Sequence, residues 1–170
     1  MMVAMGALFM GLGSVFQSLD MTVAALSSLL VAIVYVEIGS PYTYLVWICT
    51  TIITAVIYQG SAMWLMYLLL FGIYPILKGY IERLPRFAWW PIKLVFGNVA
   101  FVLMFFGVQL ITGLPFIDPD ESFFGIKGVA MYIATWILLN VALIAFDFFL
   151  TVMVRYYMVK VRPKIRKILK

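Results

Sequence analysis

The sequence predicts an all-α membrane protein built as a compact bundle of six transmembrane helices. Three observations carry this prediction: 66% of the 170 residues are hydrophobic, only 11% are charged, and the hydrophobic residues gather in six long segments. Soluble chains are about 45–50% apolar and about 25% charged, so a core of this size could not bury the excess. Because one spanning helix takes about 20 residues, the segments nearly exhaust the chain. We therefore expect residues 1–170 to form a single integral membrane domain.

The six segments are divided by polar or turn-forming residues. Their expected bounds are about 1–16, 21–36, 42–58, 62–81, 90–113 and 129–157, followed by a basic tail at 158–170. The first segment has neither a basic stretch ahead of it nor a small-residue cleavage site after it, which favours a helix over a signal peptide. The tail has an apolar face among basic residues, so it is either an interfacial helix or a frayed end that only sets topology.

The positions of the basic residues predict the orientation. Four of them flank the joint between the fourth and fifth segments (Lys78, Arg83, Arg86 and Lys93), and the chain from Arg155 onward has no acidic residue. Short cytoplasmic loops carry the excess of Lys and Arg, and six spans place both ends on one side, so both termini are predicted to be cytoplasmic. These residues lie beside the membrane, so the tail is expected to contact anionic lipid rather than nucleic acid.

Several classes of function are disfavoured by what the sequence lacks. There is no His, and the single Cys49 lies inside an apolar stretch, where a small buried hydrophobe is the usual role. The chain has no glycine-rich phosphate loop and no general base at a catalytic spacing. We therefore expect no enzyme, no metal and no cofactor.

Polar residues inside the apolar segments form a second pattern, because such residues are costly in a membrane. The expected intramembrane polar network comprises Glu37, Lys78, Lys93, Asn98, Asn140 and Asp147. One interpretation is a coupling or gating network, in which Lys78 and Lys93 could pair with Glu37 and Asp147 as two couples of opposite charge. The other, favoured here, is that Lys78 and Lys93 extend to lipid headgroups while Glu37 ends a helix in water. Asp147 lies too deep for that role and is expected to have a specific partner.

A third set gathers at the predicted outer mouth, at the joints after the first, third and fifth segments. The candidate substrate-binding residues are Gln17, Asp20, Tyr58, Gln59, Gln109 and Thr112. Aromatic and amide groups of this kind could hold a small molecule in an outward-opening cavity lined by Tyr58 and Gln109. The alternative is that the aromatic residues belong to the membrane interface and the loop residues are simply solvated.

Small residues mark a close approach of helices in the first segment. Ala7 and Gly11 lie four residues apart, a spacing that lets another helix pack closely. An internal packing seam and a docking surface for another subunit predict the same two residues, and both remain open.

The whole chain resembles the substrate-binding S components of bacterial energy-coupling factor (ECF) transporters in size, topology and segment spacing. The pair Ala7 and Gly11 is similar to the small-residue pattern by which S components contact the coupling subunit. The strings from Phe71 to Lys78, from Lys93 to Asn98 and from Asn140 to Asp147 also resemble a set that recurs in small bacterial membrane proteins.

The resemblance implies a multi-pass protein of the bacterial plasma membrane that binds a small molecule of vitamin or micronutrient type from outside. It would dock through Ala7 and Gly11 on a transmembrane coupling subunit, with ATP hydrolysis on two separate ATPase subunits.

Two other classes of protein fit the same sequence. One is a structural or assembly protein of the MreD type, which binds partner proteins and needs no polar outer mouth. The other is an ion or proton carrier that uses Asp147, which the scarcity of other deep acidic residues disfavours.

Overall fold

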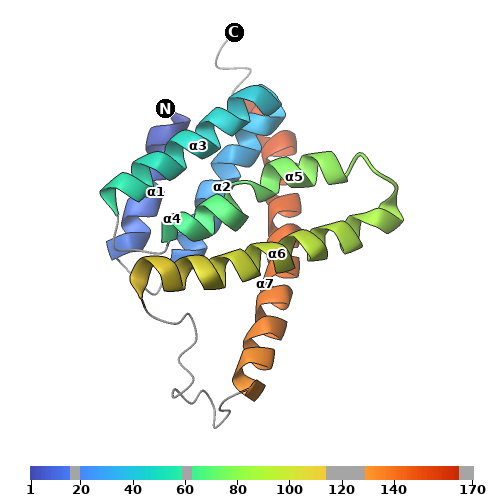
Figure 1. Cartoon of the computed structure of the whole chain (residues 1–170). Helices are drawn as coiled ribbons and strands as arrows, with labels where there is room; N and C mark the ends of the chain where they lie inside the picture. The colour runs from blue at the N-terminus through green and yellow to red at the C-terminus, as the bar shows by residue number, and fades with distance from the viewer. Residues whose placement is uncertain (16–19, 59–62, 114–128, 165–170) are drawn as a thin grey trace.

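The computed structural model describes residues 1–15, 20–58, 63–113 and 129–164, without the side chains at 14, 15, 20 and 112, and these ranges are helical between short turns (Figure 1). The elements are α1 (Met2–Val15), α2 (Asp20–Glu37), α3 (Ser40–Ile57), α4 (Met63–Met66), the π-helix η2 (Tyr67–Phe71), α5 (Tyr74–Ile81), α6 (Arg86–Thr112), α7 (Val129–Tyr156) and the π-helix η3 (Tyr157–Val161). The expected segments agree with these bounds to within about four residues at each end, but the fourth segment is divided into three elements.

Four helical stretches are long and apolar enough to cross a membrane: Ser40–Ile57, Met63–Ile81, Arg86–Ile111 and Val129–Lys164. Two further apolar helices, Met2–Gly13 and Met21–Glu37, are shorter. The start of α1 and the last described turns of the chain lie toward the same end of the molecule, at the top of Figure 1. The length and composition of the helices thus indicate a membrane protein.

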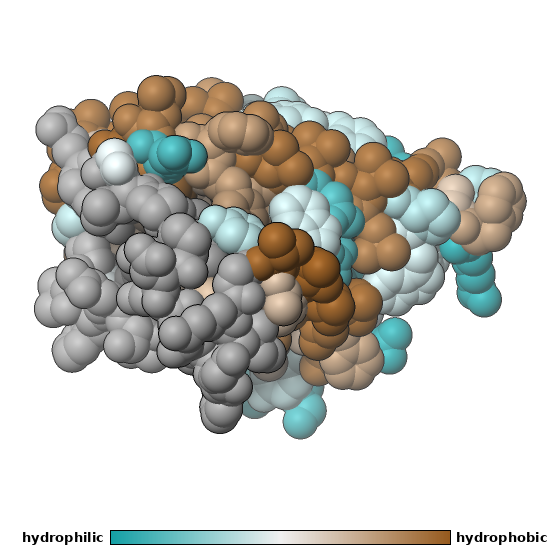
Figure 2. Space-filling view, turned by 60° about the horizontal axis from the view of Figure 1, so that its bottom comes forward, coloured by the Kyte–Doolittle hydropathy of each residue, from teal (hydrophilic) through white to brown (hydrophobic). Residues whose placement is uncertain are grey.

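The packed core lies between α2, η2, α5, α6 and α7. Tyr67 and Tyr74 are fully buried there, with Phe101 from α6 and Leu150 from α7 beside them. Outside this core, large apolar side chains remain exposed, including Phe106 at 70%. Figure 2 shows hydrophobic side chains across much of the visible face, with hydrophilic ones in scattered places. An apolar exterior of this extent is the surface that lipid would cover.

The fourth expected segment is interrupted between η2 and α5. Pro75 has no backbone N–H, so it cannot donate to the carbonyl oxygen of Phe71 one turn earlier. The chain instead widens into the π turn, in which the Gly72 N–H donates to the Tyr67 carbonyl oxygen at 2.7 Å. The indole of Trp47 occupies the place where a side chain at Gly72 would stand. The absence of a side chain at Gly72 therefore lets α3 approach closely. The interruption separates α5 from the helix that precedes it.

Two glycines shape the ends of helices. Gly39, with φ of 105°, precedes α3, and Gly113, with φ of 69°, ends α6. Positive φ is strained for residues that carry a Cβ, which explains glycine at both turns. The Thr43 hydroxyl donates to the Gly39 carbonyl oxygen at 2.7 Å and ties the first turn of α3 to the joint.

Candidate functional site

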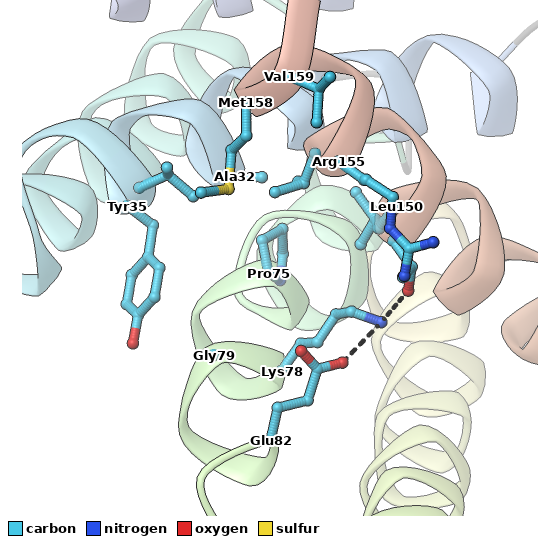
Figure 3. Close-up of a pocket in the computed structure, with 13 residues that line it drawn as sticks. Ala32, Tyr35, Pro75, Lys78, Gly79, Glu82, Leu150, Arg155, Met158 and Val159 are labelled. Carbon is cyan, nitrogen blue, oxygen red and sulfur yellow. Dashed lines mark hydrogen bonds and ion pairs between the residues drawn. The ribbon is translucent and has the colours of Figure 1, made fainter. Parts of the chain in front are cut away.

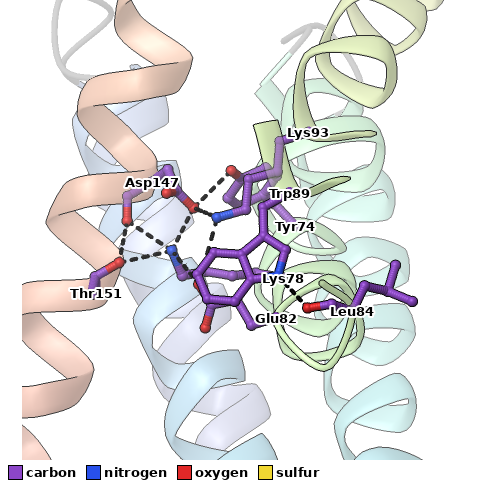
Figure 4. Close-up of polar contacts among 8 residues, drawn as sticks. All are labelled: Tyr74, Lys78, Glu82, Leu84, Trp89, Lys93, Asp147 and Thr151. Atoms are coloured by element: carbon purple, nitrogen blue, oxygen red, sulfur yellow. Dashed lines mark hydrogen bonds and ion pairs between the residues drawn. The ribbon is translucent and has the colours of Figure 1, made fainter. Parts of the chain in front are cut away.

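A buried charged cluster joins α5, α6 and α7, with Asp147 of α7 at its centre (Figure 4). The Oδ1 atom of Asp147 accepts hydrogen bonds from the Tyr74 hydroxyl at 2.9 Å and from the Lys93 Nζ at 2.8 Å. The Lys78 Nζ also donates to this oxygen. The main chains of Tyr74 and Lys78 belong to α5, and that of Lys93 belongs to α6, so one carboxylate links three helices.

Lys78 makes further contacts with α7 and with Glu82. Its Nζ donates to the Asp147 carbonyl oxygen at 3.0 Å and to the Thr151 hydroxyl at 2.8 Å. Glu82 completes the charge balance, because its Oε1 lies 3.1 Å from the Lys78 Nζ and 3.5 Å from the Lys93 Nζ. Two ammonium groups thus face two carboxylates, the arrangement that buried charges require. We call Tyr74, Lys78, Glu82, Lys93, Asp147 and Thr151 the Asp147 cluster.

The expectation that Lys78 and Lys93 extend to lipid headgroups is wrong. Lys78 is 8% exposed and Lys93 is 3% exposed, and both Nζ atoms point inward to Asp147. The deep carboxylate provides the negative charge and the hydrogen bonds that headgroups would otherwise supply. Asp147 therefore has specific partners, as its depth predicts. Glu82 was not among the candidates, although its spacing of four residues from Lys78 is a signal for a helical ion pair.

Glu37 lies apart from the Asp147 cluster. Its Oε1 is 2.8 Å from the Arg162 Nε and accepts a hydrogen bond from the Tyr157 hydroxyl at 3.3 Å. These contacts tie the end of α2 to the last turns after α7. The structure thus divides the predicted intramembrane network into separate groups.

Asn98 and Asn140 form another such group, a pair of amides across α6 and α7. Each side-chain amide donates to the other's oxygen, at 3.1 and 3.3 Å. Each also donates to the carbonyl oxygen four residues earlier in its own helix, at 2.8 and 2.9 Å. Gly97 allows this approach, because a side chain there would meet Leu143 of α7.

The expected outer mouth is only partly described. Gln17 and Gln59 lie outside the described residues, and so do the side chains of Asp20 and Thr112. Tyr58 is half-buried, and Gln109 is exposed. Neither residue lines either of the two cavities described in the structure.

The small residues of α1 face the rest of the chain at two points. The hydroxyl of Tyr58 occupies the place where a side chain at Gly11 would stand, and Thr50 of α3 lies 3.1 Å from the corresponding place at Gly6. Gly11 thus belongs to an internal packing seam. Ala7 is half-buried.

A cavity of about 440 Å³ opens between α2, α5 and the end of α7 with η3 (Figure 3). Its lining residues are Ala32, Tyr35, Val36, Pro75, Lys78, Gly79, Glu82, Leu150, Thr151, Val154, Arg155, Met158 and Val159. The walls are mostly apolar, and Lys78, Glu82 and Thr151 connect them to the Asp147 cluster. We call this space the α2–α5–α7 cavity. The lining residues come from three separate segments, so their spacing in the sequence does not mark them as one site. The one signal in the sequence is that Arg155 follows Asp147 by eight residues, which places the two on the same face of a helix.

Within the part of the chain that the structure describes, no three His, Cys, Asp or Glu side chains lie together as metal ligands. The acidic and basic groups of the Asp147 cluster are engaged with one another, which leaves the cavity as the place where another molecule fits.

Comparisons with protein families, with curated proteins and with solved structures found no match to this chain.

Proposed function

We propose that this chain is a non-catalytic membrane subunit that binds a small molecule between its helices. The observation that carries the proposal is the α2–α5–α7 cavity, with its apolar walls and few polar groups. Pockets for small molecules have volumes of about 300–1,000 Å³ and combine mostly apolar walls with a few orienting polar groups. The volume of about 440 Å³ lies in that range.

The setting we propose is an ECF-type importer of the bacterial plasma membrane, in which this chain is the S component and separate subunits hydrolyse ATP. The chain would span the membrane six times with both termini cytoplasmic, and its ligand would be of vitamin or micronutrient type. The resemblance of the whole sequence supports this setting. The proposed orientation follows from the basic residues at the joint after α5, Arg83 and Arg86, and from those after η3. The binding position we propose is the α2–α5–α7 cavity rather than the expected outer mouth.

A second candidate function is an assembly protein of the MreD type. The contact of Tyr58 with Gly11 favours it, because this contact packs the ends of α1 and α3 together where an outward cavity was expected. Such a protein would use the Asp147 cluster only to hold its helices together and would bind partner proteins through its exterior.

Native mass spectrometry of the gently extracted protein, from cells that make it naturally, separates the two candidates. We expect a co-purified small molecule that is lost in Ala32→Phe, because Ala32 is 5% exposed and lines the cavity. The matched control is Val152→Phe on the exposed face of α7, which should retain the molecule. Protein partners without any small molecule would contradict the binding role and favour assembly.

The same preparation tests the importer setting through its partners. We expect a coupling subunit and two ATPase subunits to co-purify, and Ala7→Leu to reduce their yield. Gly11→Leu is unsuitable, because it would displace Tyr58 within the chain. Ala134→Leu, on the exposed face of α7, is the control. Unchanged co-purification with Ala7→Leu would count against docking through α1.

A further inference from the structure

We infer that the ligand of the α2–α5–α7 cavity is an anionic amphiphile, a molecule with a long apolar chain and a terminal carboxylate or phosphate. This inference rests on the part of the proposed function by which the cavity binds a small molecule, and it replaces the vitamin or micronutrient type of ligand that the resemblance implies. It follows from two features of the lining, the apolar walls and the charge of Arg155.

The apolar part of the lining runs along α7 and the start of η3. Leu150, Val154 and Met158 follow one another at intervals of four residues, so their side chains lie on one face of the helix. Ala32 of α2 and Pro75 of α5 stand across from this face in Figure 3. Burying a hydrocarbon chain against these walls contributes about 25 cal/mol for each Å² removed from water.

The charged part of the lining has one cation in excess. Lys78 and Lys93 are balanced by Asp147 and Glu82 within the Asp147 cluster. The contacts of the Lys78 Nζ already go to two carboxylates, a carbonyl oxygen and a hydroxyl, so it is engaged on several sides. The cavity therefore carries the unbalanced positive charge of Arg155.

Arg155 is suited to hold the head of the ligand. Within the part of the chain that the structure describes, Arg155 forms no hydrogen bond or ion pair, unlike Arg162, which is paired with Glu37. Arg155 is exposed and lines the cavity, next to Val154 in sequence. A guanidinium recognises carboxylates and phosphates with paired N–H donors. An anionic head at Arg155 thus leaves the apolar chain of the same molecule along Leu150, Val154 and Met158.

The test is a native mass-spectrometry titration of the purified full-length chain in detergent. The probes are oleate, dioleoyl phosphatidylglycerol, the uncharged methyl oleate and inorganic phosphate. We expect oleate, phosphatidylglycerol or both to bind, and methyl oleate and phosphate to bind much more weakly. Binding of oleate alone identifies a free fatty acid type of ligand, and binding of phosphatidylglycerol identifies a lipid of the bilayer.

Two substitutions of arginine form a matched pair. Arg155→Gln should weaken the binding of the anionic probe about tenfold, the loss expected for one charge-assisted hydrogen bond. Arg162→Gln removes the same charge outside the lining and should leave the binding unchanged. Equal weakening by both variants, or equal binding of oleate and methyl oleate, would overturn the inference, because either result shows attraction without recognition of the head at Arg155.

The failure of this inference can be told from the failure of the proposed function. If Ala32→Phe removes a co-purified molecule while no anionic amphiphile binds, the cavity binds another class of ligand and this inference alone is wrong. If Ala32→Phe changes neither the co-purified molecule nor the binding of an anionic amphiphile, both the proposed function and this inference are wrong. Size-exclusion chromatography checks that Ala32→Phe is folded, and Val154→Phe, at a half-buried lining position, replaces it if it is not.

Discussion

Asp147 is the residue on which the packing of three helices depends. Its carboxylate accepts hydrogen bonds from Tyr74, Lys78 and Lys93, and its removal would leave two buried ammonium groups with Glu82 alone. An uncompensated buried charge is far more costly than an exposed one, since neither lipid nor protein replaces the lost partner.

We predict that Asp147→Asn lowers the stability of the detergent-extracted protein by about 3–5 kcal/mol, the cost of breaking a buried ion pair. A thermal unfolding curve followed by the fluorescence of the tryptophans measures the loss. Glu82→Gln is the matched control and should cost less, because the Glu82 side chain is 38% exposed. Adding Lys93→Met to Asp147→Asn should recover part of the loss. Equal midpoints for Asp147→Asn and the wild type would show that Asp147 is not the centre of the cluster.

Sequence reasoning located most of the charged residues but not their directions. The depth of Asp147 in an apolar segment predicted a specific partner, and the structure provides three. The sequence left two directions open for Lys78 and Lys93, because a lysine near a helix end reaches either lipid headgroups or the core according to how its helix is rotated. That rotation depends on packing, which hydropathy does not record. For the same reason the cavity was not predictable from the sequence, because its lining depends on which faces of α2, α5 and α7 meet.

At the scale of elements, the contact between α6 and α7 depends on the absence of a side chain at Gly97. Leu143 of α7 fills the space beside this glycine, and Asn98 and Asn140 pair next to it. Close packing of this kind, with small residues at the contact and amides bonded across it, is how helices associate in lipid. The contact also brings Lys93 of α6 to Asp147 of α7.

We predict that Gly97→Val forces α6 away from α7 and destabilises the protein by about 1–3 kcal/mol, the usual cost of overpacking. Ala134→Val on the exposed face of α7 is the matched control and should change stability little. Thermal unfolding of both variants in the same detergent makes the comparison. A Gly97→Val protein as stable as the control would mean that α6 and α7 do not approach each other here.

The extent of the long helices was predictable from hydropathy, whereas the interruption of the fourth segment was not. Segments 90–113 and 129–157 correspond to α6 and α7, because a continuous apolar run in lipid has to satisfy its backbone within a helix. The run from Met63 to Ile81 is equally continuous in hydropathy, so only Pro75 signalled a change of helix. A π turn needs no particular residue, so the sequence pattern does not reveal it.

At the scale of the whole molecule, the basic residues are confined to two ranges and the exterior is largely apolar, and both features bear on topology. Every Lys and Arg side chain described in the structure belongs to residues 78–93 or 155–164. Four stretches have the length of a membrane span, whereas the apolar parts of α1 and α2 are shorter. If α1 and α2 also cross, which makes six spans, the start of α2 lies on the opposite side of the membrane from the basic residues. If they do not cross, which leaves four spans, the start of α2 lies on the same side as the basic residues.

We predict that single cysteines introduced into a Cys49→Ser background report six spans. Met21→Cys and Val129→Cys, both at exposed positions, should react with a membrane-impermeant maleimide in intact cells. Arg83→Cys and Lys164→Cys should react only after the cells are opened, because the basic end faces the cytoplasm. Protection of Met21→Cys in intact cells, with Val129→Cys still reactive, would indicate four spans and show that α1 and α2 do not cross.

The π turn at Tyr67–Phe71 makes the spacing of this segment informative in a way that its hydropathy is not. A π turn is equivalent to one residue inserted into an α-helix, and each α-helical residue turns the helix by about 100°. Deleting one residue between Leu68 and Leu70 would therefore convert the π turn into a regular α-helical turn and keep Tyr74 and Lys78 facing Asp147, because the π turn absorbs the extra residue. A chain shorter by one residue here would keep the contact with its aspartate, whereas a deletion after the π turn and before Tyr74 would rotate the tyrosine and the lysine away by about 100°.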